Sequence, residues 1–231
     1  MKTNLQQSSS SDALPPLVLA LAEANRESLC GGKAAGLAQA LELGLPVPDG
    51  FVVTNHTFLL FLQQDDLGNR INALVTSLAE PGIEQLRTTS STISEWVLAA
   101  DLPAEILDTL KGQWETGTNT HPLIVRSSAV GEDSTEASFA GQLDSFLDIG
   151  SFEELEVALK QCWASYWSER SLAYQASTGK QLQGMGVLVQ QQVDSRVAGV
   201  LFTRPPIQQD KSGHQYMLGE YCYGQGITLV S

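Results

Sequence analysis

The chain has 231 residues, which is enough for one large domain or two small ones with a core that needs no disulfide or metal. Hydrophobic residues make up 42% and charged residues 17%, which excludes a fibrous, collagen-like or wholly disordered protein. The net charge of −13 argues against a surface for nucleic acid or for an anionic membrane, because such surfaces need clustered lysine and arginine. A nucleotide ligand remains compatible with this charge, since a few well-placed cations suffice for phosphates.

The cysteines and the apolar runs indicate the compartment. Cys30, Cys162 and Cys222 lie far apart without a CxxC spacing, which argues against a disulfide framework or a zinc site and favours reduced thiols. No apolar run reaches the ~18 residues of a membrane span. Residues 14–22 are apolar enough to suggest a signal peptide, but the preceding Asp12 and the two prolines inside the run favour a cytoplasmic protein.

The first half of the chain predicts short strands and a predominantly helical content. Residues 1–16 form a polar, serine-rich tail that we expect to be disordered. The remaining pattern predicts a strand at 17–21 and a helix from the glycines at 31–32 to Gly44. A strand at 51–53 and a helix capped by Thr54 or Asn55 follow. From 66 to 118 the chain is expected to be mostly helical, with Trp96 and Trp114 packed between helices. The linker 117–121 marks an expected boundary between an N-terminal subdomain, 17–120, and a second one, 121–231.

The second half changes to strands separated by polar loops. The pattern predicts strands at 123–126 and 143–149 around a polar loop at 127–141, followed by an amphipathic helix at 152–167. Two strands at 186–193 and 197–203 are joined by a turn at 194–196. A strand at 216–221 and a glycine loop at 224–226 follow. Helices beside paired antiparallel strands indicate an α+β fold.

A first candidate anion site lies at Gly31-Gly32-Lys33, where a helix begins. Two glycines let backbone N–H groups approach an anion, the helix N-terminus adds positive potential, and Lys33 adds a full charge. The spacing is not that of a Walker A loop. A tight turn with an exposed lysine is the alternative interpretation of this segment.

A second candidate is Arg126-Ser127-Ser128, at the end of a predicted strand. An arginine fork with adjacent hydroxyls is well suited to phosphate, although Arg126 could instead pair with Glu132 or Asp133. The small residues around one phenylalanine in 127–141 suit a mobile lid over phosphates, and an ordinary surface loop is the alternative.

The strand 187–193 is a candidate adenine site. It combines apolar residues with Gln190, Gln191 and Gln192, so it could offer backbone groups to an adenine edge and apolar side chains to its face. A sheet strand with an amide-rich end explains the same residues without a ligand.

Five segments follow one another in an order typical of a known family: Gly-Gly-Lys-Ala-Ala-Gly-Leu at 31–37, Gly-Leu-Pro-Val-Pro-Asp-Gly-Phe-Val-Val-Thr at 44–54, Val-Arg-Ser-Ser at 125–128, Glu-Asp with Ala-Ser-Phe-Ala-Gly-Gln at 132–142, and Gly-Val-Leu-Phe-Thr at 199–203. With these motifs, the chain from about Leu17 onward resembles the N-terminal ATP-binding domain of the phosphoenolpyruvate synthase / pyruvate phosphate dikinase family, which rifampicin phosphotransferases share. The resemblance implies an ATP-grasp-like fold in which nucleotide lies between two α+β subdomains.

The resemblance also implies roles for individual residues. Lys33 and Arg126 match the lysine and arginine that contact ATP phosphates, and with Mg²⁺ they would act by positioning and charge neutralisation. The remaining expected nucleotide-site residues are Ser127, Gly141 and Ser145, with Gln190, Gln191 and Val193 bordering the adenine. In such enzymes ATP phosphorylates a histidine on a mobile domain, which passes the phosphoryl group to pyruvate or another acceptor.

The sequence departs from the family pattern near its end. Family members commonly have Gly-Leu-Gly-Glu where this chain has Gly224-Gln225-Gly226-Ile227. The chain stops at Ser231, before the expected Mg²⁺ ligands, and it contains neither the phosphohistidine domain nor the domain that binds phosphoenolpyruvate or pyruvate. We therefore expect a C-terminally incomplete domain that is inactive on its own. A non-catalytic nucleotide-binding module or a folded remnant is the alternative function.

Overall fold

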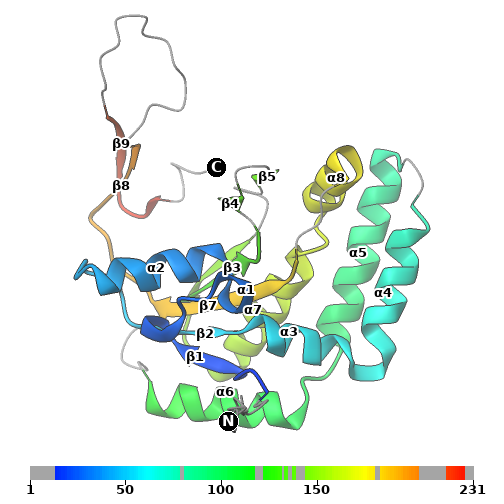
Figure 1. Cartoon of the computed structure of the whole chain (residues 1–231), viewed down its shortest axis with the longest axis horizontal. Coiled ribbons are helices and arrows are strands. Elements are labelled where there is room, and N and C mark those ends of the chain that lie inside the picture. Colours follow the sequence, from blue (N-terminus) through cyan, green and yellow to red (C-terminus); the bar gives the residue numbers. More distant parts are fainter. Residues whose placement is uncertain are drawn as a thin grey trace, which may run out of the picture.

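The computed structural model describes residues 14–78, 81–117, 122–131, 144–179, 183–202 and 217–226, together with the backbone of 133–134 and 137–138. A central antiparallel sheet has helices on both faces, and a separate two-stranded ribbon extends from one side of this body (Figure 1). The mixed helix and sheet content confirms the expected α+β class.

The main sheet has five strands in the order β1-β2-β7-β3-β6, and every neighbouring pair is antiparallel. The strands are β1 (Val18–Ala20), β2 (Gly50–Val53), β3 (Leu123–Ala129), β6 (Ser145–Ile149) and β7 (Met185–Gln191). Strands from both sides of residue 120 therefore pair in one sheet. The division into two subdomains at this position stays a prediction.

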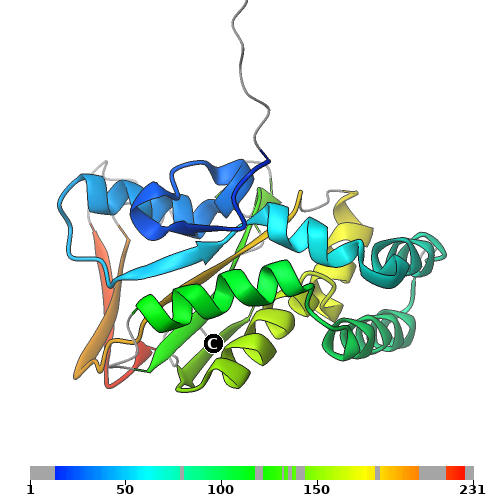
Figure 2. The same ribbon diagram turned by 90° about the horizontal axis from the view of Figure 1, so that it is seen from below.

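One face of the sheet is covered by the N-terminal helices. These are the 3₁₀ turn η1 (Leu21–Glu23), α1 (Glu27–Cys30) and α2 (Gly32–Glu42), which lie together on one side in Figure 2. Ala34 and Ala38 of α2 pack there against Val52 and Leu188 of the sheet. Small residues on this face of α2 let the helix backbone approach the strands closely.

The opposite face carries the larger core. The helices there are α3 (Asn55–Leu62), α4 (Leu67–Thr76, after the 3₁₀ turn η2 at Gln64–Asp66), α5 (Ile83–Ala99), α6 (Ala104–Thr116), α7 (Phe152–Ser165) and α8 (Glu169–Thr178). Val187 and Val189, which alternate with Leu188 along β7, belong to this core, together with the stacked rings of Phe61 and Trp163, whose centroids are 4.7 Å apart. Because successive side chains of a strand point to opposite faces, β7 contributes residues to the cores on both sides of the sheet.

The two tryptophans expected between helices lie at helix contacts. The Arg70 guanidinium of α4 lies 4.3 Å from the centre of the Trp96 ring on α5, and the Trp114 ring of α6 meets Phe152 of α7 edge-on at 6.3 Å. Thr54 occupies the N-cap position of α3, as predicted. Its hydroxyl donates to the carbonyl of Pro16 at 2.7 Å, so this side chain ties down the segment before β1 instead of capping the helix.

The strands expected at 186–193 and 197–203 are present as β7 and β8 (Val197–Phe202), but they do not pair with each other: β7 lies between β2 and β3, and β8 pairs with β9 (Leu218–Tyr223). Two expectations about secondary structure are wrong in detail. β3 continues to Ala129, where a polar loop was expected, because the buried hydroxyls of Ser127 and Ser128 have hydrogen-bond partners. The helix expected at 152–167 ends at Ser165, and Ser168 caps the additional helix α8 by accepting from the Ser171 N–H at 3.2 Å.

Two further features complete the described fold. The ribbon residues Val197, Leu201, Tyr221 and Tyr223 are exposed apolar side chains. The short strands β4 (Asp133–Ser134) and β5 (Ala137–Ser138) pair with each other. Within the described part of the chain, every helix is too short or too polar to cross a membrane.

Candidate functional site

The start of α2 is fixed directly above strands β3 and β7. Gly31 has φ of +79°, and a Cβ atom built on it would lie 1.8 Å from the Ser128 carbonyl oxygen. Gly186 of β7 pairs with Ser128 of β3. It also has little room, since a Cβ atom built on it would lie 2.4 Å from the Cys30 carbonyl oxygen. Only glycine allows these backbone approaches. The glycine motif therefore serves to place a helix N-terminus on the sheet.

Ser128 also supplies the cap that α2 lacks in its own sequence. Gly31 stands at the N-cap position and has no side chain to offer. The Ser128 hydroxyl, from β3, accepts from the Ala34 N–H of the first turn at 3.0 Å, in a buried position. One of the unpaired N–H groups of the helix is thus satisfied by the neighbouring strand.

The alternation of β3 separates the residues of the Arg-Ser-Ser motif. Arg126 and Ser128 are two residues apart and share the face that α2 covers. Ser127 points to the opposite face, where it is buried and its hydroxyl donates to the Asp144 carbonyl at 3.0 Å. The structure therefore brings Arg126 to the side of α2, and it does not bring the Ser127 hydroxyl there.

A cavity of about 410 Å³ lies beside Arg126. Five of the residues expected to bind nucleotide from the sequence line it together: Arg126, Ser145, Gln190, Gln191 and Val193. The volume falls in the range of about 300–1,000 Å³ typical of small-molecule sites. We call this space the β3–β7 cavity.

The lysine of the glycine motif lies one helical turn away from this cavity. Leu37 of α2 lines the β3–β7 cavity, and Lys33 precedes it by four residues, on the same face of the helix. Lys33 also influences the thiol of Cys162. Burial raises the pKa of that thiol far above its ordinary range, the Asp144 carboxylate raises it further, and the Lys33 ammonium lowers it. Ser145, the residue after Asp144, pairs with Arg126 across β6 and β3.

The end of β7 uses several of its polar groups for the fold. Gln190 is buried, and its amide donates to the Pro48 carbonyl at 2.9 Å. The backbone N–H of Gln191 donates to Asp49, and that of Gln192 to Pro122, both at 2.9 Å. These groups cannot serve an adenine without breaking structural bonds. The Gln191 side chain and Val193 remain available on this wall of the cavity, whereas the Ser195 hydroxyl donates to the Gly224 carbonyl at 3.0 Å.

Several lining residues were not singled out from the sequence as site residues. They are Leu37, Pro48, Ile124, Leu147, Ser195, Gln225 and Gly226. Leu37 could have been predicted because it lies four residues after Lys33, on the same face of the helix. Ile124 could have been predicted because it lies two residues before Arg126, on the same face of the strand. No local signal marks Pro48 or Gln225, because the tertiary fold alone brings them to the cavity. The expected site residue Gly141 lies outside the described residues, as do Glu132 and residues 135–136 and 139–140 of the expected lid segment.

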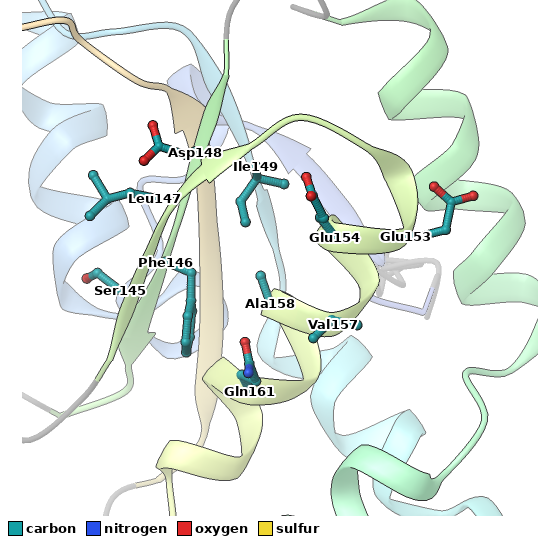
Figure 3. A pocket seen from close by; sticks show the side chains of 10 residues that line it. All are labelled: Ser145, Phe146, Leu147, Asp148, Ile149, Glu153, Glu154, Val157, Ala158 and Gln161. Atoms are coloured by element: carbon teal, nitrogen blue, oxygen red, sulfur yellow. The ribbon is translucent and has the colours of Figure 1, made fainter.

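A second cavity, of about 550 Å³, lies between β6 and α7 (Figure 3). Its charged lining side chains are the carboxylates of Asp148, Glu153 and Glu154, and no lysine or arginine is among the described residues that line it. Glu154 already accepts from the N–H groups of Gly150, at 2.8 Å, and Ser151, at 3.1 Å. Phosphates need cationic donors, so the smaller β3–β7 cavity with Arg126 is the better candidate for a nucleotide.

The described thiols and acids do not form a metal site. Among the residues that the structure describes, no group of three or more His, Cys, Asp or Glu side chains is arranged to hold a metal ion. Burial raises the pKa of the Cys30 thiol to about 11, so this group is neutral at physiological pH. Mg²⁺ is usually held by one or two carboxylates together with substrate phosphates, so its ligands stay a prediction here.

Comparison with known proteins assigns the chain to a family. Residues 27–231 match the family model for the AMP/ATP-binding domain of pyruvate phosphate dikinase. The chain is 33% identical over 211 residues to a protein of Staphylothermus marinus named "Probable phosphoenolpyruvate synthase", and 33% identical over 226 residues to the phosphoenolpyruvate synthase of Aeropyrum pernix. It is 33% identical over 204 residues to a rifampicin phosphotransferase of a Streptomyces species.

These matches cover most of this chain and a small part of each relative. They include 87%, 92% and 87% of this chain, but only 25%, 28% and 23% of the respective relatives. The chain thus spans about a quarter of the length of the curated relatives it matches. The family assignment expected from the sequence motifs is confirmed: the chain belongs to the pyruvate phosphate dikinase AMP/ATP-binding domain family.

Proposed function

We propose that the β3–β7 cavity binds ATP, as part of a dikinase-type phosphotransferase. The single observation that supports this most is the convergence of Arg126, Ser145, Gln190, Gln191 and Val193, which are up to 67 positions apart in sequence (193 − 126), on one cavity. Arg126 offers a planar fork for two phosphate oxygens, and Lys33 stands near it at a helix N-terminus. The apolar side chains of Leu37, Ile124 and Leu147 would face the base or ribose.

In this proposal the chain contributes positioning and electrostatics to phosphoryl transfer. Lys33 and Arg126 would hold the triphosphate and neutralise charge as it shifts during transfer. Mg²⁺ would arrive with ATP, bound by the phosphates and by ligands outside the described residues. The phosphoryl group would pass to a histidine, and then to pyruvate or another acceptor, in parts of a longer protein. The two-lobed ATP-grasp arrangement and a cytoplasmic location belong to the same proposal.

The alternative of a non-catalytic nucleotide-binding module predicts the same binding without transfer. The cavity beside Arg126 supports binding in both cases, and turnover separates them. We expect ATP binding without measurable turnover when the 231-residue chain is assayed by itself, because the proposal places the acceptor histidine in other parts of a longer protein. Phosphoryl transfer from ATP to a separately supplied histidine domain of a relative would support the phosphotransferase, and its absence in a chain that binds ATP would favour the non-catalytic module.

Calorimetric titration of the chain with ATP and Mg²⁺ tests the proposed site. We expect saturable binding that Arg126→Ala weakens about 10-fold or more, as loss of a charge-assisted hydrogen bond implies. Gln161→Ala, in the cavity between β6 and α7, serves as the control and should leave the affinity unchanged. Absence of ATP binding by the wild-type chain would refute the proposed function. Weakening by Gln161→Ala instead of Arg126→Ala would move the site to the other cavity.

A further inference from the structure

A bulge interrupts β6 beside the β3–β7 cavity. The β3–β6 register passes through the pairs Leu123 with Ile149 and Val125 with Phe146. Two steps along β3 therefore correspond to three along β6, so one extra residue lies within β6. Asp148 has φ of +59°, in the left-handed region that L-residues rarely adopt and that one class of bulge uses.

The bulge decides which β6 side chains face the nucleotide cavity. In a regular strand, Phe146 and Ile149 would point to opposite faces, because they are an odd number of residues apart. With the extra residue, Ile149 is buried in the helical core and Phe146 packs against the same core. Ser145 and Leu147 line the β3–β7 cavity; they also border the cavity between β6 and α7, but their side chains point away from α7 in Figure 3.

The Gln192 side chain holds the bulge through two reciprocal hydrogen bonds. The backbone N–H of Asp148 donates to Gln192 Oε1 at 2.7 Å. Gln192 Nε2 donates to Asp148 Oδ1, also at 2.7 Å. The two residues are 44 positions apart, and both bonds lie near solvent. The Gln192 side-chain amide thus pairs with both the backbone N–H and the carboxylate of Asp148, the residue of β6 with positive φ.

The pair joins two walls of the same cavity. Gln192 is the first residue after β7, at the start of the connection to the β8–β9 ribbon. Val193 and Ser195 of that connection line the cavity, as do Ser145 and Leu147 of β6. A loss of the reciprocal bonds would release the bulge and remove one restraint on the connection, which keeps the bond from the Gln192 N–H to the Pro122 carbonyl.

We propose that Gln192 and Asp148 are positioning residues of the nucleotide site, which hold the β6 bulge and the β7–β8 connection in the geometry that ATP requires. This inference rests on the proposed ATP-binding function and adds a determinant that is separate from the groups on the phosphates. Neither residue has to touch the nucleotide, since each acts through the placement of Leu147 and Val193.

An exchange of donor and acceptor between the two positions tests the pair. In Gln192→Glu, a carboxylate faces the Asp148 carboxylate, so the second bond is replaced by repulsion. In Asp148→Asn, the amide oxygen can still accept from Gln192, and asparagine tolerates the left-handed backbone. In the double variant, the new amide at position 148 can donate to the new carboxylate at position 192, and the backbone N–H of residue 148 still donates to the other carboxylate oxygen. Gln63→Glu, at an exposed position after α3, provides the same charge change elsewhere.

Titration with ATP and Mg²⁺, together with hydrogen exchange of the residue-148 amide in the nucleotide-free chain, provides the two readouts. We expect Gln192→Glu to weaken ATP binding about 3- to 10-fold, the range for one or two hydrogen bonds of this kind, and to speed exchange of that amide. Asp148→Asn should remain close to wild type, as should Gln63→Glu. The double variant should recover both affinity and protection.

The possible failures are distinguishable. An unchanged ATP affinity in Gln192→Glu, with binding by the wild-type chain intact, would overturn the inference and leave the proposed function standing. Weak binding in the double variant would also overturn it, because it would mean that the Gln192 amide contacts the nucleotide directly. A wild-type chain that binds no ATP would overturn the proposed function and this inference with it.

Discussion

At the scale of single residues, the proposed phosphate binding depends on two cations that reach one face of the sheet from different elements. Arg126 comes from β3 and lines the β3–β7 cavity. Lys33 comes from the first turn of α2, where the helix dipole adds to its charge. A cation at a helix N-terminus is unfavourable for the helix itself. An anionic group close to this helix N-terminus would offset that cost.

Lys33 should recognise phosphate and not adenine. Replacing Lys33 by alanine should cost about 1.5–3 kcal/mol of ATP binding and leave adenosine binding nearly unchanged, because only ATP presents phosphates to the ammonium group. Parallel calorimetric titrations with ATP–Mg²⁺ and adenosine measure both effects. Lys111→Ala, in an exposed position of α6, is the matched control. Equal losses for ATP and adenosine would show that Lys33 acts on the fold.

Arg126 should act through its fork geometry. We expect Arg126→Lys to weaken ATP binding nearly as much as Arg126→Ala, because a single ammonium cannot bridge two phosphate oxygens in the same way. The melting temperature should stay close to that of wild type. Arg87→Lys is the control: Arg87 is exposed and makes surface pairs with Glu84 at 3.6 Å and Glu169 at 3.7 Å, so its replacement should change little. Full ATP affinity in Arg126→Lys would contradict a bidentate role.

At the scale of elements, the position of α2 depends on contacts with β3 and β7. The helix has no cap of its own, and its first turn is held by the Ser128 hydroxyl and by the close approach of Gly31. The same contacts determine where Lys33 lies relative to Arg126. Stability and site geometry are therefore coupled at this junction.

Ser128→Ala should destabilise the fold by about 1–3 kcal/mol, since it leaves the Ala34 N–H buried without a partner. Urea denaturation measures this loss as a lower midpoint at an unchanged slope. Ser177→Ala is the matched control, because the Ser177 hydroxyl is exposed and bonds within its own helix. A Ser128→Ala variant as stable as the control would show that water or a shifted helix satisfies the Ala34 N–H.

Two glycine-to-alanine substitutions in the same segment should have opposite signs. Gly31→Ala should strongly destabilise the protein, because its Cβ would overlap the Ser128 carbonyl and its φ is +79°. Gly36→Ala, inside α2 with no atom within 4 Å of the new Cβ, should stabilise it by about 0.5–1 kcal/mol. Thermal and urea unfolding of both variants give the comparison. Equal effects would mean that helix propensity alone decides the outcome.

At the scale of the whole molecule, stability should fall in alkaline solution. Burial raises the pKa of Cys30 from 9.0 to about 11, and it raises the pKa of Cys162 in the same direction. Between pH 9 and 11 the unfolded chain loses these protons while the folded chain keeps the Cys30 proton. The unfolded state then binds fewer protons, so the free energy of unfolding decreases as pH rises.

Urea titrations at a series of pH values from 7 to 11 measure this decrease. We expect Cys30→Ala to show a smaller alkaline loss than wild type, because it removes one of the two buried thiols. Cys222→Ala is the control, since Cys222 is only partly buried. Identical alkaline profiles for wild type and Cys30→Ala would show that other groups control this pH range.

By itself, the sequence determined the α+β class, the family and most element positions. The spacing of apolar residues, the glycine motif before α2 and the arginine of β3 are local signals, so they can be seen in short windows. The convergence of Arg126, Ser145 and the glutamine strand on one cavity could be expected only through the family resemblance. The separate division into subdomains and the metal ligands remain predictions.

The tertiary structure alone decided which strands pair, which face each side chain takes and how α2 is capped. β7 pairs with β2 and β3 although β8 follows it closely, because a strand buried on both faces gains more from two central neighbours than from one hairpin partner. The Ser128 cap on Ala34 and the Gln192–Asp148 pair join residues 94 and 44 positions apart. Such contacts depend on the register and curvature of the complete sheet, and a local window of sequence contains neither.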